Sequence, residues 1–194
     1  VYFRDKQTLH RAASVLNSHE NLTILARDQS SLDLLQTFFK ARALLCPDLA
    51  FCLAPLPRRT MADQDIVFLA RTDQESNSPN GSTTSSVTAG CDWTDCESAW
   101  QWRLGNAAVR WEVNHPTIAR MANRFTAGVL RANWNRMAGE RLLSGCRLLA
   151  RGRVVVTDRL HAHILTLLMG IPHVVFDNNY GKIRRFHDTW TASS

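Results

Sequence analysis

Long apolar runs and metal-ligand clusters are scarce in this 194-residue sequence. The longest apolar stretch, from His163 to Val175, is broken by Gly170 and Pro172. It therefore falls short of the roughly 20 uninterrupted residues that a membrane-spanning helix needs, and we expect no transmembrane segment in this chain. The cysteines Cys91 and Cys96 lack a second pair at zinc-ligand spacing, so we predict no metal site.

Several catalytic and nucleotide-binding motifs are also absent. The sequence contains no phosphate loop of the form GxxxxGK[ST], no GxGxxG, no GxSxG and no HExxH. Each of these motifs brings a defined group to the reacting atoms, so their absence removes the main support for a nucleotide hydrolase, a serine hydrolase or a zinc protease.

Lysine is rare, although the net charge is +6. Lys6, Lys40 and Lys182 are the only lysines, and the other basic residues are arginines, whose planar guanidinium suits phosphate and carboxylate groups. Net charge by itself speaks to solubility rather than to fold or partner. A basic module that binds nucleic acid or another acidic polymer stays open as an alternative, but we expect no nucleic-acid partner.

The hydrophobic content of 45% is enough for a buried core, and the first third alternates helices with short strands. We predict a helix over Lys6–Ser18, a strand over Asn21–Ala26 and a second helix capped by Ser30 or Ser31. An apolar segment follows over Ala43–Leu53, with Cys46 and Cys52 expected as buried thiols. This alternation is typical of a parallel α/β sheet.

A second α/β unit is predicted after a linker over Pro55–Asp65. It opens with a strand at Ile66–Ala70, followed by a polar segment, Gln74–Gly90, that we expect to be mobile. A long amphipathic helix is predicted over Pro116–Leu149. The last quarter reads as a strand, helix and strand over 153–158, 159–169 and 173–177, a βαβ unit.

The end of the 153–158 strand carries the most informative polar residues. Open α/β sheets bind ligands at the carboxyl ends of their strands, where Asp158, Arg159 and His161 meet a helix N-terminus. We predict an anion site there, with Asp158 as a plain helix cap the structural alternative. His163 lies about 200° around the helix from His161 and should be a packed histidine.

Charged residues also follow two other apolar strands. Arg27-Asp28 and Arg71-Thr72-Asp73 could form plain salt bridges or line one anion-binding cleft with Arg159. The segment Asn178-Asn179-Tyr180-Gly181-Lys182 could be a tight turn or a loop that presents Lys182 to an anion.

The run VVVTDRLHAHILTLLMGIPHVVFDNNYGKIRRFHDTW closely resembles the C-terminal signature of polysaccharide pyruvyl transferases. The segments Leu44–Leu53, Arg27-Asp28 and Phe68–Glu75 follow the order of that family. The resemblance covers nearly the whole chain, and it is specific in the last quarter and moderate elsewhere.

The resemblance implies an α/β, GT-B-like fold, with two Rossmann-like domains facing across a cleft and the N-terminal part of the first domain missing. It places residues 1–56 in the first domain and residues 57–194 in the second. It also implies transfer of a pyruvyl group from phosphoenolpyruvate to a sugar diol in exopolysaccharide biosynthesis, without a cofactor. The compartment would be the cytoplasm in a bacterium or the Golgi lumen in a eukaryote.

Under this interpretation, His161 serves as the acid–base group, because imidazole titrates near neutrality, and Arg159 binds the phosphate or carboxylate. The other candidate substrate-binding residues are Arg27, Arg71, Asp73, Asp158, Leu160, Asn178, Tyr180 and Lys182. A glycosyltransferase that uses a nucleotide sugar on the same architecture is the second enzymatic alternative.

Overall fold

A computed structural model describes residue 3 and residues 5–53, 55–70, 114, 116–178 and 181–192. Within residues 116–130, and at residue 133, it describes the backbone only. Two parallel sheets organise the described part of the chain, one of two strands and one of three. The predicted α/β class is therefore confirmed. The predicted domains 1–56 and 57–194 stay a prediction.

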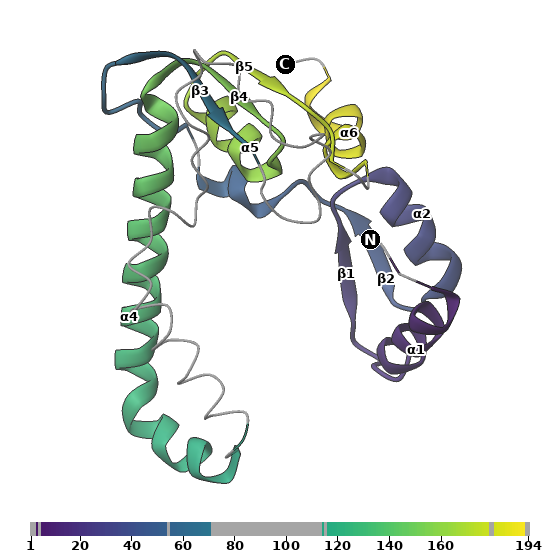
Figure 1. Ribbon diagram of the computed structural model, residues 1–194. Coiled ribbons are helices and arrows are strands. Elements are labelled where there is room, and N and C mark those ends of the chain that lie inside the picture. Colours follow the sequence, from purple (N-terminus) through teal and green to yellow (C-terminus); the bar gives the residue numbers. More distant parts are fainter. Residues whose placement is uncertain are drawn as a thin grey trace.

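The first sheet pairs β1 (Thr23–Ala26) with β2 (Arg42–Leu45), with Thr23 opposite Arg42. Helices α1 (Lys6–Leu16) and α2 (Gln29–Phe38) lie on one side of it (Figure 1). Alternate side chains of a strand point to opposite faces, so Ala26 of β1 is buried while Leu25 is 53% exposed. The buried core of this part comprises Leu9, Ala13, Ala26, Leu35 and Phe39.

The cap of α2 differs from the prediction. Asp28, not Ser30 or Ser31, is the N-cap residue, and its Oδ1 accepts the Ser31 N–H at 2.8 Å. The hydroxyls of both serines donate to the same carboxylate. Asp28 has extended backbone angles, as an N-cap requires, whereas Ser30 and Ser31 already lie within the first turn.

The second sheet has the order β3–β4–β5, all parallel, formed by Gln64–Leu69, Gly152–Thr157 and His173–Val175. Helix α5 (Leu160–Leu168) and the C-terminal end of α4 (Pro116–Ala150) pack on one face of it. Val155 and Leu69 on that face are fully buried. In Figure 1, the other end of α4 extends away from the sheet. Among the described helices, none is both long and apolar enough to cross a bilayer.

The segment predicted as a linker, Pro55–Asp65, is held against the second sheet. The Leu56 N–H donates to the Leu168 carbonyl at 2.9 Å, and the Arg58 guanidinium donates to the Ala150 carbonyl at 2.8 Å. These bonds give the segment a defined path along the second sheet.

The two cysteines expected to be buried are not. Cys46 is half-buried, and Cys52 in the 3-10 helix η1 (Leu49–Leu53) is exposed. Neighbouring apolar residues in the sequence predicted burial, but a 3-10 turn points successive side chains in three directions, and Cys52 points outward.

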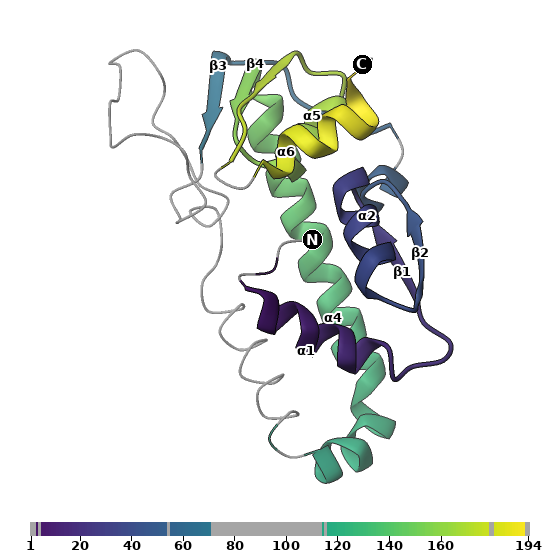
Figure 2. The same cartoon turned by 90° about the vertical axis from the view of Figure 1, so that its right-hand side faces the viewer.

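The C-terminal segment connects the two sheets. Helix α6 (Lys182–Phe186) continues into the π-helical turn η3 (His187–Thr191). Both views place α6 beside α5 and close to α2 (Figures 1 and 2). The buried Phe186 ring stacks on Phe51 of η1 with ring centroids 6.1 Å apart. Helix α6 therefore packs against η1, the segment that follows β2.

Candidate functional site

The carboxyl ends of the first sheet and the start of α5 meet around one carboxylate. Arg27, directly after β1, donates from Nη1 to Asp48 Oδ2 at 2.7 Å. His161, on the first turn of α5, places its Nε2 at 3.7 Å from the same oxygen. The predicted residues Arg27 and His161 are thus brought together, although they follow strands of different sheets.

Asp48 itself was not among the predicted site residues. Its side chain is only 11% exposed, and its Oδ1 accepts the Ala50 N–H at 3.0 Å. Burial by itself would raise the pKa of the Asp48 carboxyl, but the Ala50 N–H, Arg27 and His161 together hold that pKa below its ordinary value. Asp48 therefore stays a carboxylate near neutral pH. The signal that could have found it is its position just after β2, like the charged residues after β1 and β4.

Arg27 pairs with Asp48 and not with its sequence neighbour Asp28. Asp28 is occupied by the cap of α2, and its Oδ1 lies 4.0 Å from Arg185 Nε of α6. The Trp190 indole N–H donates to the Arg27 carbonyl at 2.8 Å. Residues of α6 and η3, which the sequence did not single out, therefore hold the backbone from which Arg27 projects.

The anion site predicted at the start of α5 stays a prediction, and the structure gives the geometry there. Arg159, not Asp158, is the N-cap residue, and its own N–H donates to the Thr157 hydroxyl at 3.1 Å. The Thr157 hydroxyl in turn donates to the Leu69 carbonyl at 2.8 Å, which ties the ends of β3 and β4 together. Arg159 and Leu160 are half-buried, while Asp158 is buried. The helix dipole and the Arg159 guanidinium together favour an anion here.

Asn178, which follows β5, is bonded to the start of α6. The buried Asn178 accepts the Lys182 N–H on its side-chain oxygen at 3.0 Å, and its carbonyl accepts the Gly181 N–H. Gly181 has φ = 66°, a left-handed conformation that glycine adopts without steric cost. Asn178 therefore anchors the start of α6, and both alternatives for this segment, a tight turn and a loop that presents Lys182, stay open. The predicted site residues Arg71, Asp73 and Tyr180, and the segment Gln74–Gly90 expected to be mobile, lie outside the described residues.

The packed role predicted for His163 is confirmed. His163 is 4% exposed, whereas the His161 side chain is 65% exposed. His163 Nδ1 lies 2.7 Å from His173 Nε2, and its Nε2 lies 3.1 Å from the Thr191 hydroxyl. His173 Nδ1 faces the Ile171 carbonyl at 2.9 Å and must carry a proton, because a carbonyl only accepts.

The proton on His173 Nδ1 sets the tautomers along the hydrogen-bonded series His173, His163 and Thr191. A neutral His173 accepts from His163 Nδ1–H, so His163 Nε2 accepts the Thr191 hydroxyl proton. Burial, the adjacent His173 and His187 lower the pKa of His163 from 6.5 to about 4. His163 is therefore neutral at physiological pH, and its bond to Thr191 anchors η3 to α5.

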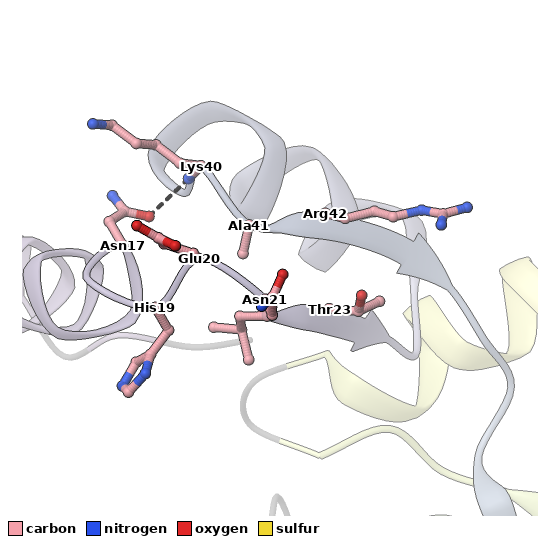
Figure 3. Close-up of a pocket in the computed structure, with 9 residues that line it drawn as sticks. Asn17, His19, Glu20, Asn21, Thr23, Lys40, Ala41 and Arg42 are labelled. Atoms are coloured by element: carbon pink, nitrogen blue, oxygen red, sulfur yellow. Dashed lines mark hydrogen bonds between the residues drawn. The ribbon is translucent and has the colours of Figure 1, made fainter.

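A wide hollow lies at the other end of the first sheet. It has a volume of about 700 Å³ and surrounds the amino ends of β1 and β2. Figure 3 shows Asn17 bonded to the Lys40 N–H, with the Lys40 and Arg42 side chains pointing outward. Parallel sheets bind ligands at their carboxyl ends, so the Arg27–Asp48–His161 group is the better candidate. The described part of the chain shows no group of three metal-ligating side chains.

Comparison with known proteins identifies relatives of the whole chain. A family model for polysaccharide pyruvyl transferases matches residues 1–180. Pyruvyl transferase 1 of Schizosaccharomyces pombe is 32% identical over 98% of this chain and 45% of that protein. EpsO of Bacillus subtilis, which bears a provisional pyruvyl transferase name, is 29% identical over 98% of this chain and 57% of that protein. The chain thus spans about half the length of these relatives.

A solved structure gives independent support for the fold. The crystal structure of an uncharacterized protein of Klebsiella pneumoniae matches 88% of this chain and 50% of that chain, with a TM-score of 0.50 and 17% identity. At that identity the likeness concerns the fold alone. The family model, in contrast, covers nearly the whole sequence and includes the Arg159–His161 signature. The chain belongs to the polysaccharide pyruvyl transferase family.

Proposed function

We propose that this protein transfers a pyruvyl group from phosphoenolpyruvate to two hydroxyls of a saccharide, which forms a cyclic ketal and releases phosphate. Family membership supports pyruvyl transfer to a polysaccharide. The observation that carries the finer proposal is the meeting of Arg27 and His161 on Asp48, beside Arg159 at the start of α5. This arrangement combines anion-binding groups with an acid–base group.

The residues present suit the charges of phosphoenolpyruvate. A phosphate and a carboxylate share one small molecule, and guanidinium groups bind both through paired N–H donors. Arg159 would bind one of these groups at the helix N-terminus, and Arg27 the other, with Lys182 and Arg71 as further candidates. We also propose the GT-B-like arrangement, in which the carboxyl ends of the two parallel sheets face the same substrate.

The reaction balances without a further reactant. The methylene carbon of phosphoenolpyruvate gains a proton, the first sugar hydroxyl adds to the adjacent carbon, and the second hydroxyl displaces phosphate. One hydroxyl proton replaces the proton taken up by the methylene, and the other leaves with phosphate. His161 would transfer these protons, since its imidazole is exposed and histidine is the side chain that most often serves in general acid–base catalysis.

The decisive experiment combines binding with turnover. We expect phosphoenolpyruvate to bind in a calorimetric titration, and a saccharide with a free vicinal or 4,6-diol to release phosphate in step with ketal formation, seen by mass spectrometry. His161→Gln should bind phosphoenolpyruvate nearly as well but transfer about 100-fold or more slowly, because an amide cannot carry the proton. His19→Gln, an exposed histidine at the opposite end of the first sheet, is the control.

A contrary result would be binding of a nucleotide sugar and not of phosphoenolpyruvate. The glycosyltransferase alternative would then replace pyruvyl transfer.

A further inference from the structure

Asp48 lies between the strand ends of the two sheets, and its Oδ2 faces one side chain from each side. Oδ2 accepts the Arg27 guanidinium at 2.7 Å and faces His161 Nε2 at 3.7 Å. Arg27 follows β1 of the first sheet, whereas His161 follows β4 of the second. A single carboxylate oxygen therefore sets the spacing between the two groups.

The three side chains differ in how firmly they are held. Asp48 is 11% exposed, and its second oxygen is bonded to the Ala50 N–H of the following turn. Arg27 and His161 are 48% and 65% exposed, so each can reach several rotamers in the absence of a partner. The anchored carboxylate is thus the fixed point, and the two exposed groups take their positions from it.

The approach of Asp48 also distinguishes the two imidazole nitrogens of His161. Nε2 faces the carboxylate at 3.7 Å, and a carboxylate attracts a protonated nitrogen, so we expect it to favour the tautomer with the hydrogen on Nε2 and to leave Nδ1 as the basic nitrogen. Nδ1 is then the atom available for proton transfer to or from a substrate. The remaining N–H donors of Arg27 stay available for an anion, because Asp48 accepts from Nη1.

We propose that Asp48 is a positioning residue, which fixes Arg27 and the imidazole of His161 on one carboxylate oxygen so that the two sheets form a single acid–base and anion-binding site. Asp48 acts through its two neighbours and does not itself contact substrate. This inference rests on the proposed function for its effect on turnover, but its effect on His161 is independent of any substrate.

The test uses Asp48→Asn, with Asp63→Asn as the matched control. Asp63 also pairs with an arginine, Arg151, at 3.1 Å. This exposed pair lies at the amino ends of β3 and β4, whereas His161 follows the carboxyl end of β4. Nitrogen-15 spectra of the imidazoles report the tautomer of each histidine, and the loss of signals in His161→Gln assigns His161. Asp48→Asn should shift the His161 tautomer balance toward a mixture, while Asp63→Asn should leave it unchanged.

Turnover gives the second readout. Asp48→Asn should lower kcat about tenfold to a hundredfold and change the pH profile of kcat, with a smaller change in KM for phosphoenolpyruvate. Asp48→Glu keeps the charge and moves it by one methylene group, so it should recover part of the rate and of the tautomer balance. If Asp48→Asn does not fold, Asp48→Glu provides the same spectral comparison against Asp63→Glu.

The outcomes separate the two proposals. His161 signals and a pH profile that match those of Asp63→Asn would overturn the positioning role of Asp48. A shifted His161 tautomer in a protein that neither binds phosphoenolpyruvate nor transfers pyruvate would support the positioning role and refute the proposed function.

Discussion

At the scale of single residues, the start of α5 places two functional candidates two positions apart in different surroundings. Arg159 is half-buried at the N-cap, whereas His161 is largely exposed and faces Asp48. A half-buried guanidinium interacts more strongly with an anion than an exposed one, because less water competes with it. Arg159 should therefore contribute to affinity and His161 to rate.

Charge and geometry can be separated at Arg159. Arg159→Lys keeps the positive charge but loses the paired N–H donors, and Arg159→Ala loses both. Calorimetry should show weaker phosphoenolpyruvate binding in both variants, with the larger loss, on the order of 2 to 5 kcal/mol, for alanine. Arg151→Ala, at the amino end of β4, should bind phosphoenolpyruvate like the parent. Equal affinity for both Arg159 variants and the parent would place the anion site elsewhere.

At the scale of elements, the turn that starts α6 depends on the left-handed conformation of Gly181. An added Cβ would meet neighbouring atoms only at 3.6 Å, so the cost of an alanine there is conformational and not steric crowding.

A pair of glycine substitutions tests this cost. Gly181→Ala should lower the free energy of unfolding by about 1 kcal/mol. Gly139→Ala, inside α4 where the new Cβ meets nothing within 4 Å beyond the adjoining helix backbone and chain neighbours, should instead raise it by up to about 1 kcal/mol, because alanine favours the helix. Urea unfolding measures both differences. Shifts of the same sign would contradict the conformational argument.

The bond from His163 to Thr191 anchors η3, so the stability of the protein should depend on pH through His163. The pKa of His163 is about 4 in the folded protein and 6.5 as an ordinary value, so the unfolded chain takes up a proton that the folded protein excludes. The stability that this neutral burial provides is complete above pH 6.5 and is lost as the pH falls toward 4. The full loss is on the order of 3 kcal/mol.

Urea unfolding between pH 7.5 and pH 4.5 checks the acid sensitivity. The difference in unfolding free energy between the parent and His163→Gln should shrink as the pH falls, while His161→Gln should follow the pH dependence of the parent. A parent that is as stable at about pH 5 as at about pH 7.5 would show that His163 accepts a proton without cost.

At the scale of the whole molecule, the segments that follow the strands join the two sheets. Trp190 of η3 bonds to the Arg27 carbonyl, Phe186 of α6 stacks on Phe51, and Asp48 faces His161. In the part of the chain that the structure describes, the second sheet has three strands with a fully buried centre at Val155, whereas the first has two strands and exposes Leu25. A parallel pair of short strands is a weak unit by itself, so the first sheet should be the less stable part.

Hydrogen exchange tests this difference in stability. Amides of β1 should exchange before those of β4 under native conditions, because fewer strands and less buried apolar surface protect them. Trp190→Phe removes one hydrogen bond to Arg27 and should speed exchange in β1 more than in β4. Slower exchange in β1 than in β4 would show that the first sheet is the more stable unit.

Much of the local structure was predictable from the sequence alone. The valine-rich strand, the helix and the turn of the last quarter occur close to their expected bounds, because periodicity and glycine or proline punctuation act over a few residues. The helical angle between His161 and His163 correctly separated an exposed histidine from a packed one. The same local logic failed at the α2 cap and at Cys52, where backbone angles and side-chain direction decided the outcome.

Only the tertiary structure decided which distant residues form the site. Asp48, Arg27, His161 and Trp190 come from four separate segments, and no spacing in the sequence relates them. Side-chain periodicity determines which face of an element is apolar, but the packing of the two sheets and of α6 determines which strand ends meet. The sequence by itself therefore indicated most of the elements, the family and two candidate site residues, while the fold brought the Asp48 carboxylate between them, because contacts between sheets depend on packing and not on local pattern.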